Sequence, residues 1–514
     1  MTTRDLVAPD AGAGDRVHAV RHRYARRGDR ATVRGRAYTA YLVALFGVFF
    51  LLPALHAASR SPGLVSLGTP ADATPVACAL AVTACWGAQL AGRFWGPLVL
   101  QPFLLHVFMS TDLSPTGYLG TIARRRLAYA GAALLLSVCT AAYLTTDLFD
   151  HPGTATQGMA VAVGLSASTA AVWLWAQVRP VSDNLVFASA VGAAASAVTV
   201  GGPAATNGTG ALWFLAGLLT ATAAALGRAA FRAIRTVDLA RLARESARAS
   251  QAQAYVLTGT LHHALDLYRP EPRGLTSALF RPDGRLRGHL HQGVVRALRT
   301  RGRALAAVAL LLAGGALLTL GVAGADGDPV PPLWVAGSVC VYLGSGWVGE
   351  TWRGLRDELT LAPLFGECWG GMPARTLTWP VAAVAVGTSL GGGLAVVTRW
   401  PQHGGRLVDT VLLVAGSVVS ALGARFLREM KTRLPLSLLL PVVTPFGDLS
   451  GLMIVAWQFD GFVAVVTGVA VMNAAPSAPG AAALALAVAA CCVWMGLRRT
   501  GWAHRGLLTR LRRV

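Results

Sequence analysis

The sequence predicts an all-α polytopic membrane protein, made of two diverged six-helix halves joined by a helical cytoplasmic linker. Three observations predict this fold class. The chain is 54% apolar and only 13% charged, with a mean hydropathy of +0.52, whereas soluble chains are about one quarter charged. Its apolar runs approach the roughly 20 residues that cross a bilayer. Its basic side chains gather in alternate gaps between these runs.

The basic residues also predict orientation. Of 45 basic side chains, all are arginine except Lys431. If each apolar run crosses once, 42 lie on one side and three, Arg60, Arg399 and Arg406, on the other. Short loops rich in Lys and Arg stay cytoplasmic, so we expect a cell-membrane protein with both termini inside. The net charge of +21 does not predict a nucleic-acid partner, because the arginines flank crossings and form no compact basic domain.

The crossings follow in order along the chain. The first half (38–230) predicts crossings at 38–57, 74–93, 127–146, 157–178, 185–203 and 210–230. The second half (304–497) predicts crossings at 304–324, 332–350, 377–397, 408–424, one within 434–473, and 480–497. As a single helix, 434–473 would be about 60 Å long, and two full crossings would place the basic tail outside. We therefore expect one crossing plus a partial or re-entrant helix, broken near Pro441, Pro445 or 447–451.

Three basic segments flank or join the halves. Residues 1–37 and 231–303 each end in a basic, partly amphipathic stretch that runs into a crossing, and 498–514 is a basic tail. Such stretches predict helices on the inner membrane face, in contact with anionic lipid headgroups. Their similarity at 16–45 and 285–310 favours an internal repeat, although flanking charge without a repeat is the alternative. Within the linker, 237–269 has no helix breaker except Gly259, which predicts a long helix or helical hairpin.

Two inner loops occupy matching places after the second crossing of each half. They are FWGPLVLQPFLLHVFMSTDLSPTGYLGTIARRR (94–126) and TWRGLRDELTLAPLFGECWGGMPARTLTWP (351–380). Both are too apolar for ordinary solvated loops and too interrupted to cross the membrane. We therefore expect each loop to dock on something at the inner surface.

Motifs for soluble chemistry are absent from the sequence. It contains no GxxxxGK[ST], HExxH or paired CxxC, so we expect no catalytic site, no resident cofactor and no metal. The glycines of GGG (391–393) lie in an apolar run, where small residues permit close helix packing. Asp147, Asp150 and His151 form the one cluster expected outside. An integral membrane transferase acting on a lipid-linked substrate stays open as an alternative.

Ionisable groups inside a membrane are expensive and usually functional. The candidates are Glu350, at the end of a crossing, and a polar transport or helix-break site made of Asp448, Gln458 and Asp460. A transport role would fit an ion-coupled secondary transporter. In the structural alternative, Asp448 caps a broken helix by accepting freed backbone N–H groups.

The arrangement resembles the permease of actinobacterial ABC-2-type ABC exporters, with two half-permeases fused into one twelve-helix chain. The segments that carry the resemblance are GPLVLQPFLLHVFMSTDLSPTGYL (96–119) and TPFGDLSGLMIVAWQFD (444–460). The resemblance implies a separate cytoplasmic ABC ATPase that binds ATP as a dimer under the two inner loops, and export of an amphipathic small molecule, peptide or lipid. The docking contacts it implies are Phe103, His106, Ser110 and Pro115 in the first loop, and Leu361, Phe365 and Trp369 in the second. The second loop departs from the pattern because it is shorter and more acidic.

Overall fold

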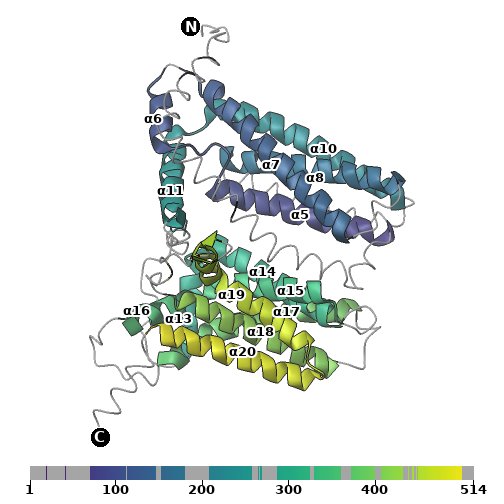
Figure 1. The fold of residues 1–514 in the computed structure, drawn as a ribbon, viewed down its shortest axis with the longest axis vertical. Helices are drawn as coiled ribbons and strands as arrows, with labels where there is room; N and C mark the ends of the chain where they lie inside the picture. The colour runs from purple at the N-terminus through teal and green to yellow at the C-terminus, as the bar shows by residue number, and fades with distance from the viewer. Residues whose placement is uncertain are drawn as a thin grey trace. The chain divides into compact units, whose positions relative to one another are not determined.

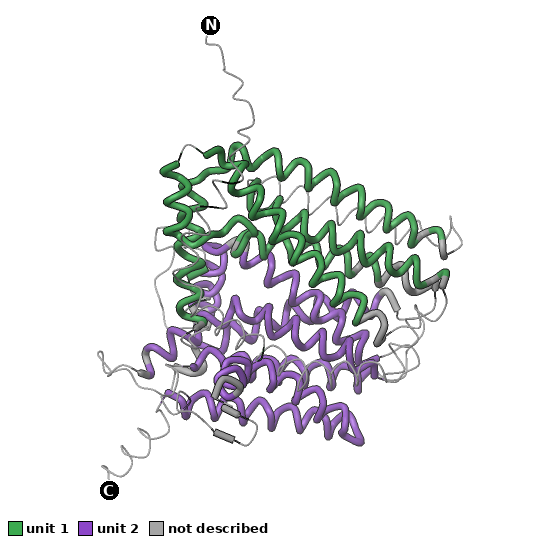
Figure 2. The backbone as a smooth tube through the Cα atoms, turned by 45° about the horizontal axis from the view of Figure 1, so that its top comes forward, with its two compact units in different colours: residues 1–268 green, residues 269–514 purple. Residues whose placement is uncertain are grey.

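The computed structural model divides the chain into two compact units, residues 1–268 and 269–514 (Figure 2). It describes residues 70–111, 113–145, 152–179, 208–257, 286–323, 329–360, 372–399, 407–431 and 450–500, with a few isolated positions between them. The division falls within the linker predicted at 231–303. Each unit is described below by itself.

Unit 1 is a bundle with α8 at its centre. Its elements are α5 (Pro70–Phe94), α6 (Pro102–Met109), α7 (Pro115–Thr145), α8 (Pro152–Val178), α10 (Gly208–Ala233), the 3-10 turn η4 (Ile234–Thr236) and α11 (Leu239–Leu257). α8 packs against α10, α5 and α7, and the short α6 packs against α11 (Figure 1). The predicted long linker helix is therefore present as α11.

Unit 2 is a second helical bundle. Its helices are α13 (Leu286–Leu298), α14 (Arg301–Ala323), α15 (Pro331–Val348), α16 (Glu350–Thr360), α17 (Met372–Arg399), α18 (Leu407–Glu429), α19 (Ser450–Asn473) and α20 (Ala478–Arg499). α14 packs against α15 and α17, and α18 packs against α20, α19 and α15 (Figure 1). Leu318, Trp334, Val341, Tyr342 and Ala421 lie in the core of this unit.

A short hairpin precedes α19. Two-residue strands β1 (Val443–Thr444) and β2 (Gly447–Asp448) pair antiparallel, and α19 begins at Ser450. α19 thus begins within the segment 447–451, where a break was predicted. The partial helix expected before the hairpin lies outside the described residues.

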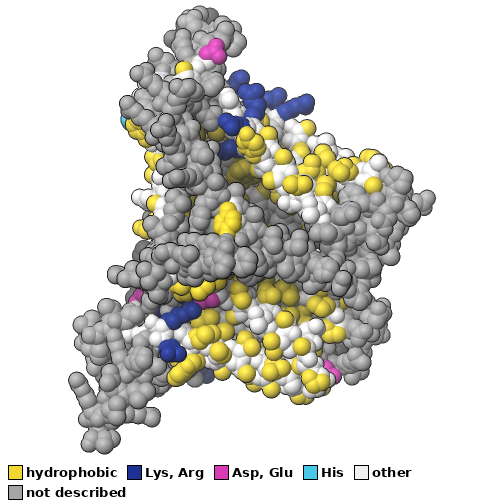
Figure 3. Space-filling model, in the orientation of Figure 1, with side chains coloured by type: hydrophobic (Ala, Val, Ile, Leu, Met, Phe, Trp, Pro, Cys, Tyr) yellow, Lys and Arg dark blue, Asp and Glu magenta, His cyan; other side chains and the backbone are white. Residues whose placement is uncertain are grey.

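Seven described helices are long and apolar enough to cross a membrane. They cover Ala155–Val178, Leu212–Thr236, Arg303–Ala323, Thr376–Val397, Leu407–Glu429, Met453–Asn473 and Ala478–Arg499. Large apolar side chains such as Leu390, Leu394 and Val397 on α17 are exposed, and hydrophobic side chains cover much of the visible helix surface (Figure 3). The chain is therefore a membrane-embedded protein whose described residues, apart from the short hairpin, are almost all helical.

Five predicted crossings are not among these seven. Three of them, at 74–93, 127–146 and 332–350, coincide with the helices α5, α7 and α15. α15 buries a face of small residues, including Gly337, Ser338, Gly344 and Ser345, as a helix that packs closely against other helices does. The crossings predicted at 38–57 and 185–203 lie outside the described residues.

The GGG run on α17 supplies a matched test of helix packing. A Cβ on Gly391 would lie 2.0 Å from the backbone oxygen of Leu312 on α14, whereas a Cβ on Gly393 would meet nothing within 4 Å. We expect Gly391→Ala to destabilise the protein by about 1–3 kcal/mol, because two helix backbones must separate. Gly393→Ala should be neutral or stabilise slightly, since alanine favours helix. Thermal unfolding in detergent measures both; equal midpoints for the two variants would contradict the packing.

Candidate functional site

Basic side chains mark one end of each unit, which we call the arginine-rich end. In unit 1 it includes Arg93 at the end of α5 and Arg124, Arg125 and Arg126 in α7. In unit 2 it includes Arg303, Arg353, Arg425, Arg428 and Arg499, joined by the contacts described below. The predicted docking and polar sites both fall at these ends.

The short helix α6 carries the first group of predicted docking residues. It begins after the extended residue Gln101, with Pro102 in its first turn, where the fixed φ of proline favours helix initiation. Leu105 and Phe108 are buried, and the Phe108 ring stacks on Tyr118 with centroids 4.8 Å apart. One face of α6 is therefore fixed against the bundle.

The opposite face of α6 is accessible. Phe103 is 62% exposed, and His106 and Ser110 are exposed as well. Their spacing of three and four residues places them on one side of the helix. Pro115, the fourth predicted contact, instead lies half-buried at the start of α7. The structure thus brings three of the four predicted residues of this loop onto one open surface.

Hydrogen bonds to α8 and α11 fix the segment that leads into α6. The backbone N–H of Leu98 donates to Oε1 of the buried Gln177 at 2.8 Å, and Gln177 Nε2 donates to Glu245 at 3.2 Å. The N–H of Leu100 donates to Ser246 Oγ at 3.3 Å. A buried N–H left without an acceptor costs about 1–3 kcal/mol, so these bonds hold the segment at one position.

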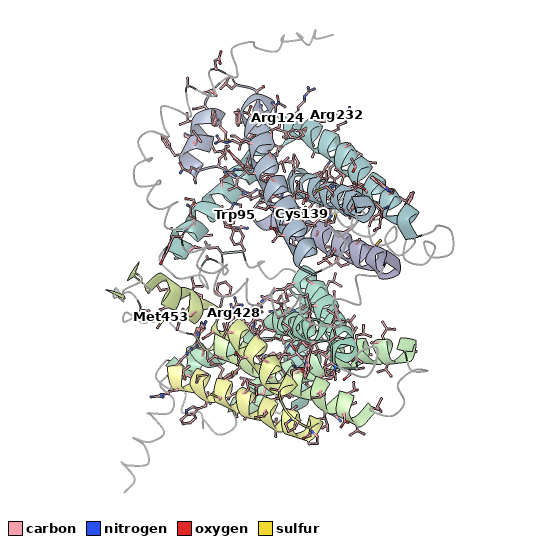
Figure 4. The ribbon with its side chains drawn as sticks, turned by 45° about the vertical axis from the view of Figure 1, so that its right-hand side comes forward. Trp95, Arg124, Cys139, Arg232, Arg428 and Met453 are labelled. Atoms are coloured by element: carbon pink, nitrogen blue, oxygen red, sulfur yellow. The ribbon has the colours of Figure 1, made fainter. Side chains whose placement is uncertain are left out.

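α7 and α8 hold the same segment by its carbonyl groups. Arg126 donates to the carbonyl of Pro97 at 3.2 Å and to that of Val99. Trp173 Nε1 donates to the carbonyl of Trp95 at 2.8 Å; Trp95 is labelled in Figure 4, where the chain leaves α5. Three helices thus position the approach to α6, with both donors and acceptors of its backbone used.

The second group of docking residues lies outside the described part of the chain. It comprises Leu361, Phe365 and Trp369. The helix before them, α16, is docked on α18: Trp352 and Leu355 are buried, Arg353 pairs with Glu429, and Arg356 donates to the carbonyl of Lys431 at 2.9 Å. Its Asp357 is exposed. Asp357 pairs with Arg356 at 2.7 Å, so the accessible side of α16 carries an ion pair, unlike that of α6.

A buried carboxylate joins α16 to α18 in unit 2. Glu429, whose side chain is 2% exposed, pairs with Arg425 at 2.5 Å and with Arg353. The Arg425 guanidinium lies 5.4 Å from the Tyr342 ring centroid. On α15, a Cβ at Gly346 would lie 2.6 Å from Arg425 Nη2, so this glycine leaves the space that the guanidinium fills. We call Arg353, Arg425 and Glu429 the Glu429 cluster.

A second carboxylate joins α18, α19 and α20. Asp460 pairs with Lys431 at 2.6 Å and with Arg499 at 2.8 Å. Lys431 Nζ also donates to the carbonyls of Trp457 and Gln458 and lies 4.7 Å from the Trp457 ring centroid. All three ammonium donors of this buried lysine are therefore used. We call Lys431, Asp460 and Arg499 the Asp460 cluster.

The predicted polar site is thus only partly assembled by the structure. Asp460 and the backbone of Gln458 take part in the Asp460 cluster, whereas Asp448 lies on β2 and its side chain is outside the described set. Glu350 pairs with Arg303. The sequence analysis did not single out Arg425, Glu429, Lys431 or Arg499. Two signals were available: Lys431 is the one lysine of the chain, and Arg425 and Glu429 are four residues apart on a helix.

Metal ligands do not gather within the described ranges, where no group of three or more His, Cys, Asp and Glu could hold an ion. Asp147, Asp150 and His151, the outer cluster noted in the sequence, lie outside these ranges.

Known proteins give no further identification of the site. No family model, curated protein or solved structure matches the chain.

The charge of Lys431 generates a pH prediction. Burial lowers the pKa of this side chain from 10.5 to about 8, and Asp460 opposes the shift; Lys431 lies two residues past the α18 span. Between these values the unfolded chain binds a proton that the folded chain lacks, so stability should rise with pH through this window. The slope should reach at most about 1.4 kcal/mol per pH unit.

Thermal unfolding of the wild type and Lys431→Met between pH 7.5 and about 10.5 measures this contribution. We expect the wild type to gain stability relative to the variant as pH rises. The variant keeps Arg499 as the partner of Asp460 and lacks the titrating amine. An identical pH dependence in both proteins would contradict the lowered pKa.

Proposed function

We propose that this chain is the membrane-spanning permease subunit of an ABC-2-type ABC exporter, working with a separate cytoplasmic ATPase dimer. The observation that carries the proposal is α6, a short helix held at the arginine-rich end of unit 1 with Phe103, His106 and Ser110 open on its outer face. A rigid helix with one accessible apolar and polar face is suited to transmit force from a docked partner. ATP would be bound by that partner.

The succession of helices supports a fused pair of halves. α5 leads to the short α6 and then α7 in unit 1, and α15 leads to the short α16 and then α17 in unit 2. α8 packs along α10, as α18 packs along α20. A diverged repeat accounts for both correspondences. In the proposed mechanism, ATPase closure under the two loops would rock the halves and expose a central path alternately.

The proposed cargo is an amphipathic small molecule, peptide or lipid, because the crossings are apolar and carry few ionisable groups. An ion-coupled secondary transporter is the second candidate, and Asp460 is the observation that favours it: a carboxylate within the α19 span is the group that such carriers use. The two basic partners of Asp460, however, fit a structural role for this carboxylate better than a role in ion coupling. Dependence of transport on ATP separates the two functions.

Substitution on α6 tests the docking surface. We expect Phe103→Ala to weaken binding of the proposed partner ATPase by about tenfold or more, as for a central aromatic contact. Co-purification of the two proteins from membranes measures the effect. Phe214→Ala on α10 is the matched control, since Phe214 is 65% exposed and Phe103 62%. Equal ATPase recovery with both variants would remove α6 from the interface.

Cysteine labelling tests the proposed orientation. In a background without the seven native cysteines, Ser250→Cys on α11 should react with a membrane-impermeant maleimide only after the cells are permeabilised. Gly153→Cys, at the start of α8 and exposed, should react in intact cells, because α8 carries the chain to the opposite face. Labelling of Ser250→Cys in intact cells would place α6 and α11 outside and rule out a cytoplasmic ATPase.

A further inference from the structure

The arginine-rich end of unit 2 contains more buried positive than negative charge. Beyond the pair that Arg353 makes, four cations lie at the ends of α18 and α20: Arg425, Lys431 and Arg499 of the two clusters, and Arg428 beside them. Within the described residues, two carboxylates, Glu429 and Asp460, lie among them. Buried charges are normally paired, so a bound anion would balance the charge at this end of the unit.

The spare donors belong to Arg425 and Arg428. Lys431 has three acceptors, as described above. Arg428 has a hydrogen bond of 3.5 Å to the Tyr342 hydroxyl, and no carboxylate of the described chain lies within ion-pair distance of it. Arg425 is 6% exposed, and its Nε has no acceptor among the described residues. A guanidinium offers five N–H groups in a plane, so most of these donors await acceptors.

The two arginines share one face of α18. They are three residues apart on the helix, so the side chains are neighbours, and both approach Tyr342. Arg499 reaches the same place from α20, where it lies 3.5 Å from the carbonyl of Leu427, the residue before Arg428. Two guanidinium groups therefore meet at Tyr342, and a third, from α20, contacts the same turn of α18.

The site is open to the lipid side. Arg499 is 28% exposed, and Arg428 is half-buried. On the adjoining helix, Phe459, Phe462 and Val463 are exposed and share one side of α19, because they are three and four residues apart. Figure 4 labels Arg428 and Met453 at the same end of the unit. Acyl chains can lie along this stripe while a headgroup reaches the arginines.

We propose that Arg425, Arg428 and Arg499 bind a phosphate group, supplied by the headgroup of an anionic phospholipid. Guanidinium groups bind phosphate through paired, charge-assisted hydrogen bonds, and basic pockets between membrane helices accept lipid headgroups. The site is distinct from any attraction of the basic surface helices to the membrane. It does not depend on the proposed transport function.

Native mass spectrometry of the full-length chain, titrated in mild detergent with phosphatidylglycerol or phosphatidylcholine, tests this site. We expect one tightly held phosphatidylglycerol and weak binding of phosphatidylcholine. Arg428→Gln should weaken phosphatidylglycerol binding by about tenfold, the effect of one charge-assisted contact. Arg498→Gln is the matched control, because Arg498 is exposed at the same helix end; binding should change by about twofold or less.

Two further measurements keep the test decisive. Arg428→Lys retains the charge without the planar donor pair, and should bind with intermediate affinity even if Arg428→Gln fails to fold. Inorganic phosphate is added as a competitor. If it displaces the lipid and binds alone in an Arg428-dependent manner, a phosphate site is supported but its assignment to lipid is overturned. Equal phosphatidylglycerol affinity in the wild type, Arg428→Gln and Arg428→Lys overturns the site itself.

Discussion

The ends of four helices in unit 2 depend on two carboxylates, one buried and one partly buried. Glu429 joins α16 to α18, and Asp460 joins α18 to α19 and α20. Arginines at helix ends orient a membrane protein, but a guanidinium turned into the bundle is costly unless it is paired. Each of the two carboxylates pairs with two cations at once. Charge that sets the topology is thereby also used to fix the packing.

Unit 1 fixes its corresponding end with mostly neutral groups. Gln177 and Ser246 accept the backbone N–H groups of the segment before α6, and Arg126 donates to its carbonyls. An uncharged amide pays a smaller desolvation penalty than an ion, so Gln177 and Ser246 hold the backbone N–H groups of this segment at low cost. The result is a rigid support from which the exposed side of α6 projects.

The sequence predicted the helices well where local composition decides them. The crossings expected at 408–424 and 480–497 correspond to Leu407–Glu429 and Ala478–Arg499, because apolar runs bounded by arginine define a span locally. The break before α19 followed from proline and glycine. α6 was expected only as a docking loop, although Pro102 is a helix-start signal.

The partners of the buried charges could not be predicted in the same way. Arg353 and Glu429 are 76 residues apart, and their pairing requires the packing of α16 on α18. In the sequence, Arg425 and Arg428 look like any arginine that flanks a crossing. The sequence therefore does not reveal that their side chains turn into the bundle. Gln177 likewise looked like the polar end of an apolar run. Its role depends on contact with α11, a helix that follows the next two predicted crossings along the chain.

The two short helices that follow α5 and α15 differ in a way that bears on any partner. α6 exposes Phe103 and His106, whereas α16 exposes Asp357 in an ion pair with Arg356, and its arginines also bind Glu429 and the Lys431 carbonyl. If the chain works with two identical ATPase subunits, as proposed, these would meet unlike surfaces, and a pocket shaped for an aromatic side chain would bind the second surface poorly. Two copies of a half-permease must have the same sequence, whereas the two halves of a fused chain can differ. Such a chain can keep one helix as the docking element while the other becomes a structural brace, and the arginines of α16 have the contacts expected of a brace.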